Sequence, residues 1–139
     1  LVLNEEVWNS DCLEYNVNRV YEFIVQNSIK SQSVDTQAIC ECCRVESDMD
    51  IKYIKMNDTL RKSKEDNPII VLVSDMFVQP FVINGNHRIK KAFNSGIDRI
   101  EVYILDADNV IQCLISEDYR TAYKIYKKLH KLVGMKLNC

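Results

Sequence analysis

Five consecutive residues, Asn84-Gly85-Asn86-His87-Arg88, combine the side chains and the glycine that an anion-binding turn needs. The apolar run before them is typical of a strand, and the apolar residues after them recur at helical spacing. A glycine between a strand and a helix lets the backbone turn tightly, so that the first N–H groups of the helix converge at the positive end of its dipole. Arg88 adds a planar fork suited to phosphate, and His87 can donate or transfer a proton near neutral pH. The segment therefore predicts a phosphate site formed by Gly85, Asn86, His87 and Arg88, with His87 and Arg88 as the candidate catalytic residues.

The same residues also have a purely structural interpretation. In it, Asn86 caps the helix, His87 bonds to a nearby carbonyl group, and Arg88 pairs with an acidic side chain. A glycine-x-His-Arg segment in an arbitrary protein is more often of this kind. Both interpretations stay open at the level of the sequence.

Other charged residues could extend such a site. Lys90 and Lys91 follow directly and add positive charge, while Lys55 and Arg61 are candidates for contact with the outer phosphates of a nucleotide or with a nucleic acid. Phosphoryl transfer or phosphodiester cleavage would also need a carboxylate as a metal ligand or base. The candidates for that role are Asp75, Asp66 and Glu65, although surface solvation is the commoner role for each of them.

The composition indicates one ordered domain. The chain has 139 residues, 47% of them hydrophobic, with 3 glycines and 2 prolines, which disfavours disorder and turn-rich β-sandwiches. The net charge of −2 argues against a generally basic nucleic-acid binder, but residues 1–50 are acidic and residues 116–139 are basic. No window is apolar enough to span a membrane, and the first residues are too acidic for a secretory signal. We therefore expect a cytoplasmic protein without a membrane partner.

The six cysteines do not follow a metal-binding or disulfide pattern. Cys40, Cys42 and Cys43 lack the spacing of a zinc site, and the chain has two histidines. In an intracellular protein we expect the thiols to be reduced and several of them to pack as small apolar residues.

Helical periodicity dominates the first 50 residues. Leu13, Val17, Val20, Tyr21, Ile24, Val25 and Ile29 predict a helix over residues 13–30 with these side chains on its buried face. We expect a loop over residues 28–33 and a second helix over residues 34–45. The acidic residues 46–50 would separate this helical extension from a unit that contains strands.

The remaining segments alternate between strands and helices. The sequence predicts strands over residues 51–55, 69–73, 77–83 and 100–105, and helices over residues 57–65 and 86–93. The strands over 69–73 and 77–83 could form a hairpin, and Pro80 suggests an edge strand or a bulge.

The last helix has clear signals at both ends. Ser116 is a capping residue before Glu117 and Asp118, and Gly134 would end the helix. Its apolar stripe is formed by Tyr119, Ala122, Tyr123, Tyr126, Leu129 and Val133. The opposite face carries Lys124, Lys127, Lys128 and Lys131, which is either a solvated surface or a contact for nucleic acid. His130 reads as a surface residue.

Several of these segments form a recognisable series. They are Ile51-Lys52-Tyr53-Ile54, Pro68-Ile69-Ile70-Val71-Leu72, Phe81-Val82-Ile83 leading into the Gly85-Asn86-His87-Arg88 turn, the small residue Ala92, and Ile100-Glu101-Val102-Tyr103-Ile104. In type and order they resemble the ParB/sulfiredoxin-like superfamily over residues 51–106. The fold class that follows is α/β (α+β), with a small mixed sheet as core and helical additions over residues 1–50 and 107–139, all in one domain.

The resemblance implies a domain that binds the phosphates of a nucleotide or nucleic acid on the glycine turn. The family includes nucleotide-hydrolysing partition proteins, nucleases, a free-serine kinase and sulfiredoxin, so the implied cofactor is ATP or another nucleotide with Mg²⁺. By position, Gly85, Asn86, His87 and Arg88 would contact phosphate. Hydrolysis, phosphoryl transfer and DNA or RNA cleavage are the implied activities.

The sequence departs from the family pattern at two positions of the turn. Asn86 stands where sulfiredoxins have their cysteine, and an amide cannot act as a thiol nucleophile, so sulfinic-acid reduction is not expected. His87 replaces the first arginine of the partition proteins, and no helix-turn-helix pattern follows residue 106. An alternative function is therefore a non-catalytic module that keeps the fold and binds a protein partner.

Overall fold

The computed structural model describes residues 7–9, 12–43 and 68–138, which form a mixed α/β structure. The strand and helix predicted for residues 51–55 and 57–65 lie outside the described residues. So do the candidate site residues Lys55, Arg61, Glu65 and Asp66.

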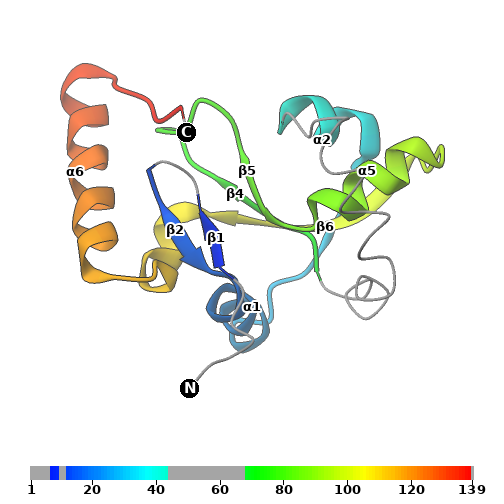
Figure 1. Ribbon diagram of the computed structural model, residues 1–139, viewed down its shortest axis with the longest axis horizontal. Helices are drawn as coiled ribbons and strands as arrows, with labels where there is room; N and C mark the ends of the chain where they lie inside the picture. Colours follow the sequence, from blue (N-terminus) through cyan, green and yellow to red (C-terminus); the bar gives the residue numbers. More distant parts are fainter. Residues whose placement is uncertain (1–6, 10–11, 44–67, 139) are drawn as a thin grey trace.

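The centre of the structure is a four-stranded mixed sheet with the order β3-β6-β4-β5 (Figure 1). Its strands are β3 (Gln32–Asp35), β4 (Ile70–Val73), β5 (Phe81–Asn84) and β6 (Arg99–Asp106). β4 runs parallel to β6 and antiparallel to β5, while β3 runs antiparallel to β6. The predicted hairpin is confirmed, and β5, which follows Pro80, is an edge strand of this sheet.

The side chains of β4 alternate between two hydrophobic clusters because a strand points successive residues to opposite faces. Ile70 and Leu72 contribute to the larger cluster, and Val71 contributes to the smaller one. All three are buried, as expected for a central strand covered on both faces.

Helices cover the two faces of the sheet (Figure 1). On one face, α2 (Thr36–Cys42) packs against α5 (Asn86–Asn94) and completes the smaller cluster through Ile39, Cys40 and Ile89. The other face carries the larger cluster, which also includes residues of α1 (Val17–Gln26), the 3-10 helix η1 (Ala107–Cys113) and α6 (Glu117–Val133). A separate two-stranded sheet, β1 (Val7–Asn9) with β2 (Glu14–Asn16), precedes α1.

The helix predicted for residues 13–30 was wrong in its length and in part of its buried face. Residues 14–16 form β2, and Asn16 then caps α1 by accepting a hydrogen bond from the Arg19 N–H group at 3.1 Å. Tyr21 and Val25 are exposed, because the helix buries Val17, Val20 and Ile24.

The acidic N-terminal region contributes strands as well as helices. The expected loop over residues 28–33 ends in β3, whose residues pair with β6 from Gln32 opposite Val102 to Asp35 opposite Arg99. Residues 1–50 are therefore not a purely helical extension, because β3 belongs to the central sheet.

The cysteines have different environments. Cys40 and Cys113 are buried thiols, Cys42 is exposed, and Cys43 is half-buried. The expectation that several thiols pack as small apolar residues is confirmed. Cys12 is disulfide-bonded, so the expectation of a reduced thiol was wrong for this residue.

The described helices include none that is both long enough and apolar enough to cross a lipid bilayer.

Candidate functional site

The Gly85 turn connects β5 to α5 with a backbone that only glycine adopts without strain. Gly85 is the N-cap residue of α5 and lies in the left-handed region, with φ 97° and ψ 14°. A Cβ atom added at this position would lie 2.7 Å from Ile69 Cγ1 and 3.0 Å from Ile69 Cα. Both the dihedral angle and the packing against Ile69 therefore require glycine here.

Two asparagine side chains hold the turn in place. Asn84 Nδ2 donates a hydrogen bond to the Pro68 carbonyl oxygen at 2.7 Å, and Asn86 Nδ2 donates to the Val82 carbonyl oxygen at 3.1 Å. The turn is thus fixed against the segment that leads into β4. The structural interpretation in which Asn86 caps the helix was wrong, since Gly85 occupies the capping position.

The first turn of α5 carries positive charge. Its N-cap residue, Gly85, has no side chain with which to cap the helix, and the first turn contains no acidic residue. The N-cap residues of α1, α2 and α6 are Asn16, Asp35 and Ser116, whose side chains cap those helices. Arg88 lies in this turn, where its charge has the same sign as the positive end of the helix dipole. The helix dipole and the charge of Arg88 would both attract a bound anion.

His87 and Arg88 are both half-buried beside the turn. The Nδ1 atom of His87 is shielded from solvent. The structure therefore brings Gly85, Asn86, His87 and Arg88 together at one helix end, as the sequence predicts, with the imidazole only partly accessible.

The two lysines that follow are not equivalent. Lys90 is buried, and its Nζ lies 5.0 Å from the centroid of the Phe93 ring, toward the other end of the helix. The expected contribution of Lys90 to the phosphate site stays a prediction, for a side chain that is buried beside Phe93. Lys91 is exposed but belongs to the last turn of α5.

Asp75 lies at the opposite end of the sheet from Gly85. It follows the last residues of β4, whereas Gly85 follows Asn84, which pairs with Ile70 at the start of β4. A strand rises about 3.3 Å per residue, so the length of β4 separates the two positions by about 10 Å. Asp75 was a wrong candidate for a metal ligand at the turn. Within the described ranges, no group of three or more His, Cys, Asp or Glu residues is arranged to hold a metal ion.

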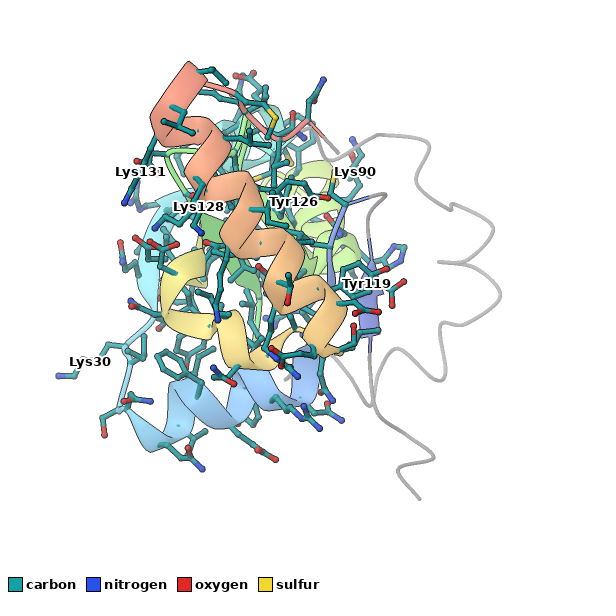
Figure 2. The ribbon with its side chains drawn as sticks, turned by 90° about the vertical axis from the view of Figure 1, so that its left-hand side faces the viewer. Lys30, Lys90, Tyr119, Tyr126, Lys128 and Lys131 are labelled. Carbon is teal, nitrogen blue, oxygen red and sulfur yellow. The ribbon has the colours of Figure 1, made fainter. Side chains whose placement is uncertain are left out.

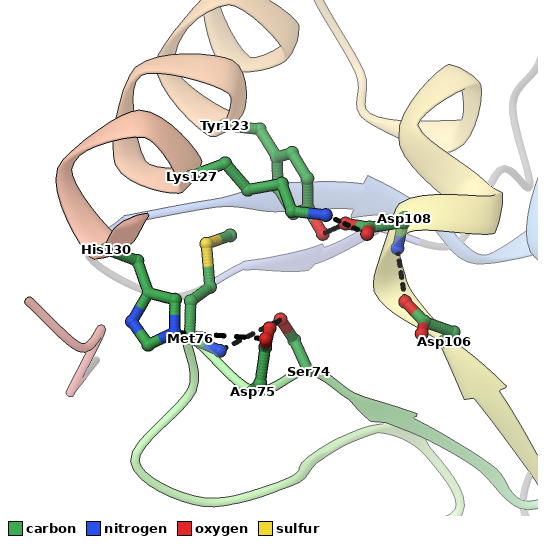
Figure 3. A network of polar contacts seen from close by, with 8 residues as sticks. All are labelled: Ser74, Asp75, Met76, Asp106, Asp108, Tyr123, Lys127 and His130. Carbon is green, nitrogen blue, oxygen red and sulfur yellow. Dashed lines mark hydrogen bonds and ion pairs between the residues drawn. The ribbon is translucent and has the colours of Figure 1, made fainter. Parts of the chain in front are cut away.

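Asp75 belongs instead to a polar network that sequence analysis missed (Figure 3). The network lies where the parallel strands β4 and β6 end, and it receives Tyr123, Lys127 and His130 from α6. Tyr123 donates a hydrogen bond to Asp108 Oδ1 at 2.5 Å, and Lys127 forms an ion pair with Asp108 Oδ2.

His130 forms the second part of this network. Its Nε2 lies 3.8 Å from Asp75 Oδ2, and its Nδ1 lies 2.9 Å from the Met135 carbonyl oxygen. The prediction of a surface histidine was therefore wrong. A signal was present in the sequence, since Tyr123, Lys127 and His130 are spaced by four and three residues and share one face of a helix.

The network anchors α6 to the sheet. Burial, followed by the charges of Tyr15, Asp106 and Asp75, raises the pKa of Tyr123 well above its usual range, so its hydroxyl remains a hydrogen-bond donor at neutral pH. Asp106 accepts a hydrogen bond from the Asp108 N–H group at 2.8 Å. Because Asp108 and Asp106 bind groups of the protein itself, we interpret this cluster as structural.

Comparison of the sequence with models of protein families and with curated proteins gave no match, and comparison of the structure with solved structures gave none either. The functional interpretation therefore rests on the residues of the Gly85 turn and on their positions.

Proposed function

We propose that this α/β domain binds the phosphate group of a nucleotide or a nucleic acid at the Gly85–Arg88 turn. The observation that supports the proposal is the start of α5, which begins at a left-handed glycine, has no acidic residue in its first turn and has Arg88 there. A helix end of this kind is suited to an anion because its N–H groups and its dipole act in the same direction.

The hydrogen bonding of the first turn defines where the anion would lie. The Ile89 N–H group donates to the Gly85 carbonyl oxygen at 3.0 Å, which is the first hydrogen bond inside the helix. The N–H groups of Asn86, His87 and Arg88 precede it and, by helix geometry, are directed toward the N-terminal end. In the proposed complex they donate to phosphate oxygens, and the guanidinium of Arg88 adds a two-pronged contact.

The resemblance to the ParB/sulfiredoxin-like superfamily is consistent with this proposal. What supports the resemblance is the order of elements, in which β4, β5, α5 and β6 follow one another along the chain. The first turn of α5 contains no acidic residue, and among the described residues no group of three or more His, Cys, Asp or Glu side chains is arranged to hold a metal ion. We therefore propose phosphate binding, and derive no phosphoryl transfer or hydrolysis from this site.

A thermal-shift assay tests the proposal. The full chain is heated with inorganic phosphate, ADP, ATP and a short oligonucleotide, each with and without Mg²⁺. A ligand present at 100 times its Kd stabilises the folded state by about 2.7 kcal/mol, which raises Tm measurably. We expect at least one of these ligands to raise Tm.

Variants assign the effect to the turn. Arg88→Ala should weaken binding by at least about tenfold, and Arg88→Lys should restore part of it, because lysine keeps the charge but not the planar fork. Lys30→Ala, which removes an exposed charge after α1, is the matched control and should bind normally. An unchanged Tm with every ligand, or an equal shift in Arg88→Ala, would contradict the proposal.

A further inference from the structure

The outer face of α6 exposes an apolar ridge formed by Ile125, Leu129, Leu132 and Val133. Their exposed fractions are 50%, 37%, 78% and 74%. The sequence predicted Leu129 and Val133 on the buried stripe, but α6 packs on the core through Tyr123, with Tyr119 and Tyr126 beside it. The helix forms one side of the molecule (Figure 2). The inner face of α6 therefore packs against the core, and the ridge is a second apolar surface of the same helix.

The ridge has the spacing of a helix-pairing seam. The half-buried Ala122 is followed by Ile125, Leu129 and Leu132, so the steps are three, four and three residues. This is the alternation of a and d positions along which two helices pack their side chains together. Apolar surface that is scattered on a protein needs no explanation, but a continuous seam of this kind marks an interaction site.

Lysines border this seam on one side. Lys124, Lys128 and Lys131 are exposed, and the helical period places all three on the same flank of the ridge. Figure 2 shows Lys128 and Lys131 on the same side of α6. No Asp or Glu follows Asp118 in the sequence, so the C-terminal half of α6 presents only positive charge. A second copy of this chain offers no Asp or Glu in this half of α6 to pair with these lysines, and packed antiparallel it would bring lysines against lysines, which charge repulsion opposes.

We propose that the α6 ridge docks an α-helix of a partner protein, and that this helix carries an apolar seam flanked by Asp or Glu. Two features favour a helix over an anionic lipid surface. The three-four-three spacing is the one that interlocks with another helix. The ridge also has no Trp or Phe, the aromatic side chains common on the apolar face of a helix that lies in a membrane surface. The partner's carboxylates would face Lys124, Lys128 and Lys131.

A designed peptide provides the probe. It is a helical peptide with Leu at the a and d positions of each heptad and Glu at the e and g positions, where the glutamates keep it from associating with itself. Fluorescence anisotropy of the labelled peptide with the full chain should show saturable binding. A control peptide with Lys in place of every Glu should bind at least tenfold more weakly.

Variants of the ridge locate the binding surface. Leu132→Ser and Ile125→Ser should each weaken peptide binding at least tenfold, and Lys128→Glu should do the same, with Tm near that of the wild type because these side chains are exposed. The matched controls are Ile97→Ser, whose side chain is as exposed as that of Ile125, and Lys30→Glu. Both controls should bind the peptide normally, and so should Arg88→Ala, which separates this surface from the proposed phosphate site.

Three results would overturn the proposal. The first is absence of peptide binding, or binding that the ridge variants leave unchanged. The second is a dimer in solution that Leu132→Ser dissociates, which would make a second copy the occupant. The third is binding of phosphatidylserine vesicles that requires the ridge while the peptide does not bind, which would assign the surface to membranes.

Discussion

Gly85 is the residue on which the proposed site depends most, because two separate requirements meet there. Its φ of 97° is costly for any residue with a Cβ atom, and Ile69 fills the space that this atom would occupy. His87 and Arg88 acquire their positions through this turn, since α5 starts at the next residue. The local signal was complete in the sequence, because the strand, the glycine and the helix are contiguous. The turn could therefore be predicted, whereas the wrong assignment of Asp75 arose from the position of a loop that sequence alone does not place.

Replacing Gly85 tests both requirements together. Gly85→Ala should destabilise the fold by about 2–3 kcal/mol, of which about 1 kcal/mol comes from the left-handed backbone and the rest from the contact with Ile69. Gly134→Ala is the control, because Gly134 has φ 69° but nothing within 4 Å of an added Cβ, so it should cost about 1 kcal/mol. Urea unfolding measures both values. Equal losses in the two variants would contradict the proposed contact.

At the scale of the elements, those with local signals were predicted and those formed by distant pairing were not. Three such signals are visible along the chain: the apolar run of β4, Gly96 after α5, and the capping residues of α6. β3 has a polar sequence and only one partly buried side chain, so the sequence divides its residues between the predicted loop over 28–33 and the predicted helix over 34–45. It is a strand because β6 lies beside it, and Arg99 fixes the pair by donating hydrogen bonds to Ser33 Oγ and to the Ser33 carbonyl oxygen, both at 2.9 Å.

The attachment of α6 was missing from the sequence analysis for a similar reason. Tyr123 and Asp108 are separated by 15 positions and lie on different elements, so neither residue alone indicates the contact. The helix and its cap were predicted correctly, but the assignment of Leu129 and Val133 to the buried face was wrong. The structure shows that α6 is rotated so that Tyr123, and not these two residues, faces the core.

Removing the Tyr123 hydroxyl tests this attachment. Tyr123→Phe should lower the free energy of unfolding by about 1–2 kcal/mol, because Asp108 loses a buried hydrogen-bond donor. Tyr21→Phe is the control, since Tyr21 is exposed on α1, and it should change stability by less than about 0.5 kcal/mol. The measurement is the urea midpoint at neutral pH. A loss in Tyr123→Phe no larger than in Tyr21→Phe would show that the network does not anchor the helix.

At the scale of the whole molecule, weakly acidic groups are buried on both faces of the sheet. Burial raises the pKa of the Cys113 thiol to about 11 and that of the Cys43 thiol to about 12. It also raises the pKa of Tyr15 and Tyr123 well above the usual value. Both hydrophobic clusters therefore include or contact groups that resist ionisation, and the folded chain holds their protons more tightly than the unfolded chain does.

This burial predicts a loss of stability in alkali. Below the ordinary thiol pKa of 9.0, Cys113 is protonated in both the folded and the unfolded chain, so it adds no pH dependence. Above that value the unfolded chain loses the proton while the folded chain keeps it up to about 11, so the free energy of unfolding falls as the pH rises through this window. The urea midpoint should be lower at a pH of about 10 than at about 8.

A variant of Cys113 measures how much of the stability loss in alkali comes from this thiol. Cys113→Ala removes one titrating thiol and should reduce the difference between the two midpoints, even though the smaller side chain lowers stability at both pH values. Ile97→Ser changes an exposed side chain that does not titrate and should leave the difference as in the wild type. A wild-type midpoint that does not fall between the two pH values would contradict the expected burial of these groups.

Phosphate that binds at the N-terminal end of α5 must perturb the amides of the first helical turn, which an NMR titration observes one by one. Backbone amide resonances of the ¹⁵N-labelled chain are followed as inorganic phosphate, and then ADP, is added. We expect the largest saturable shifts at the amides of Asn86, His87 and Arg88, and smaller shifts in the Arg88→Ala variant. If the resonances of these three amides do not shift, whether or not other resonances do, phosphate does not bind at this helix end.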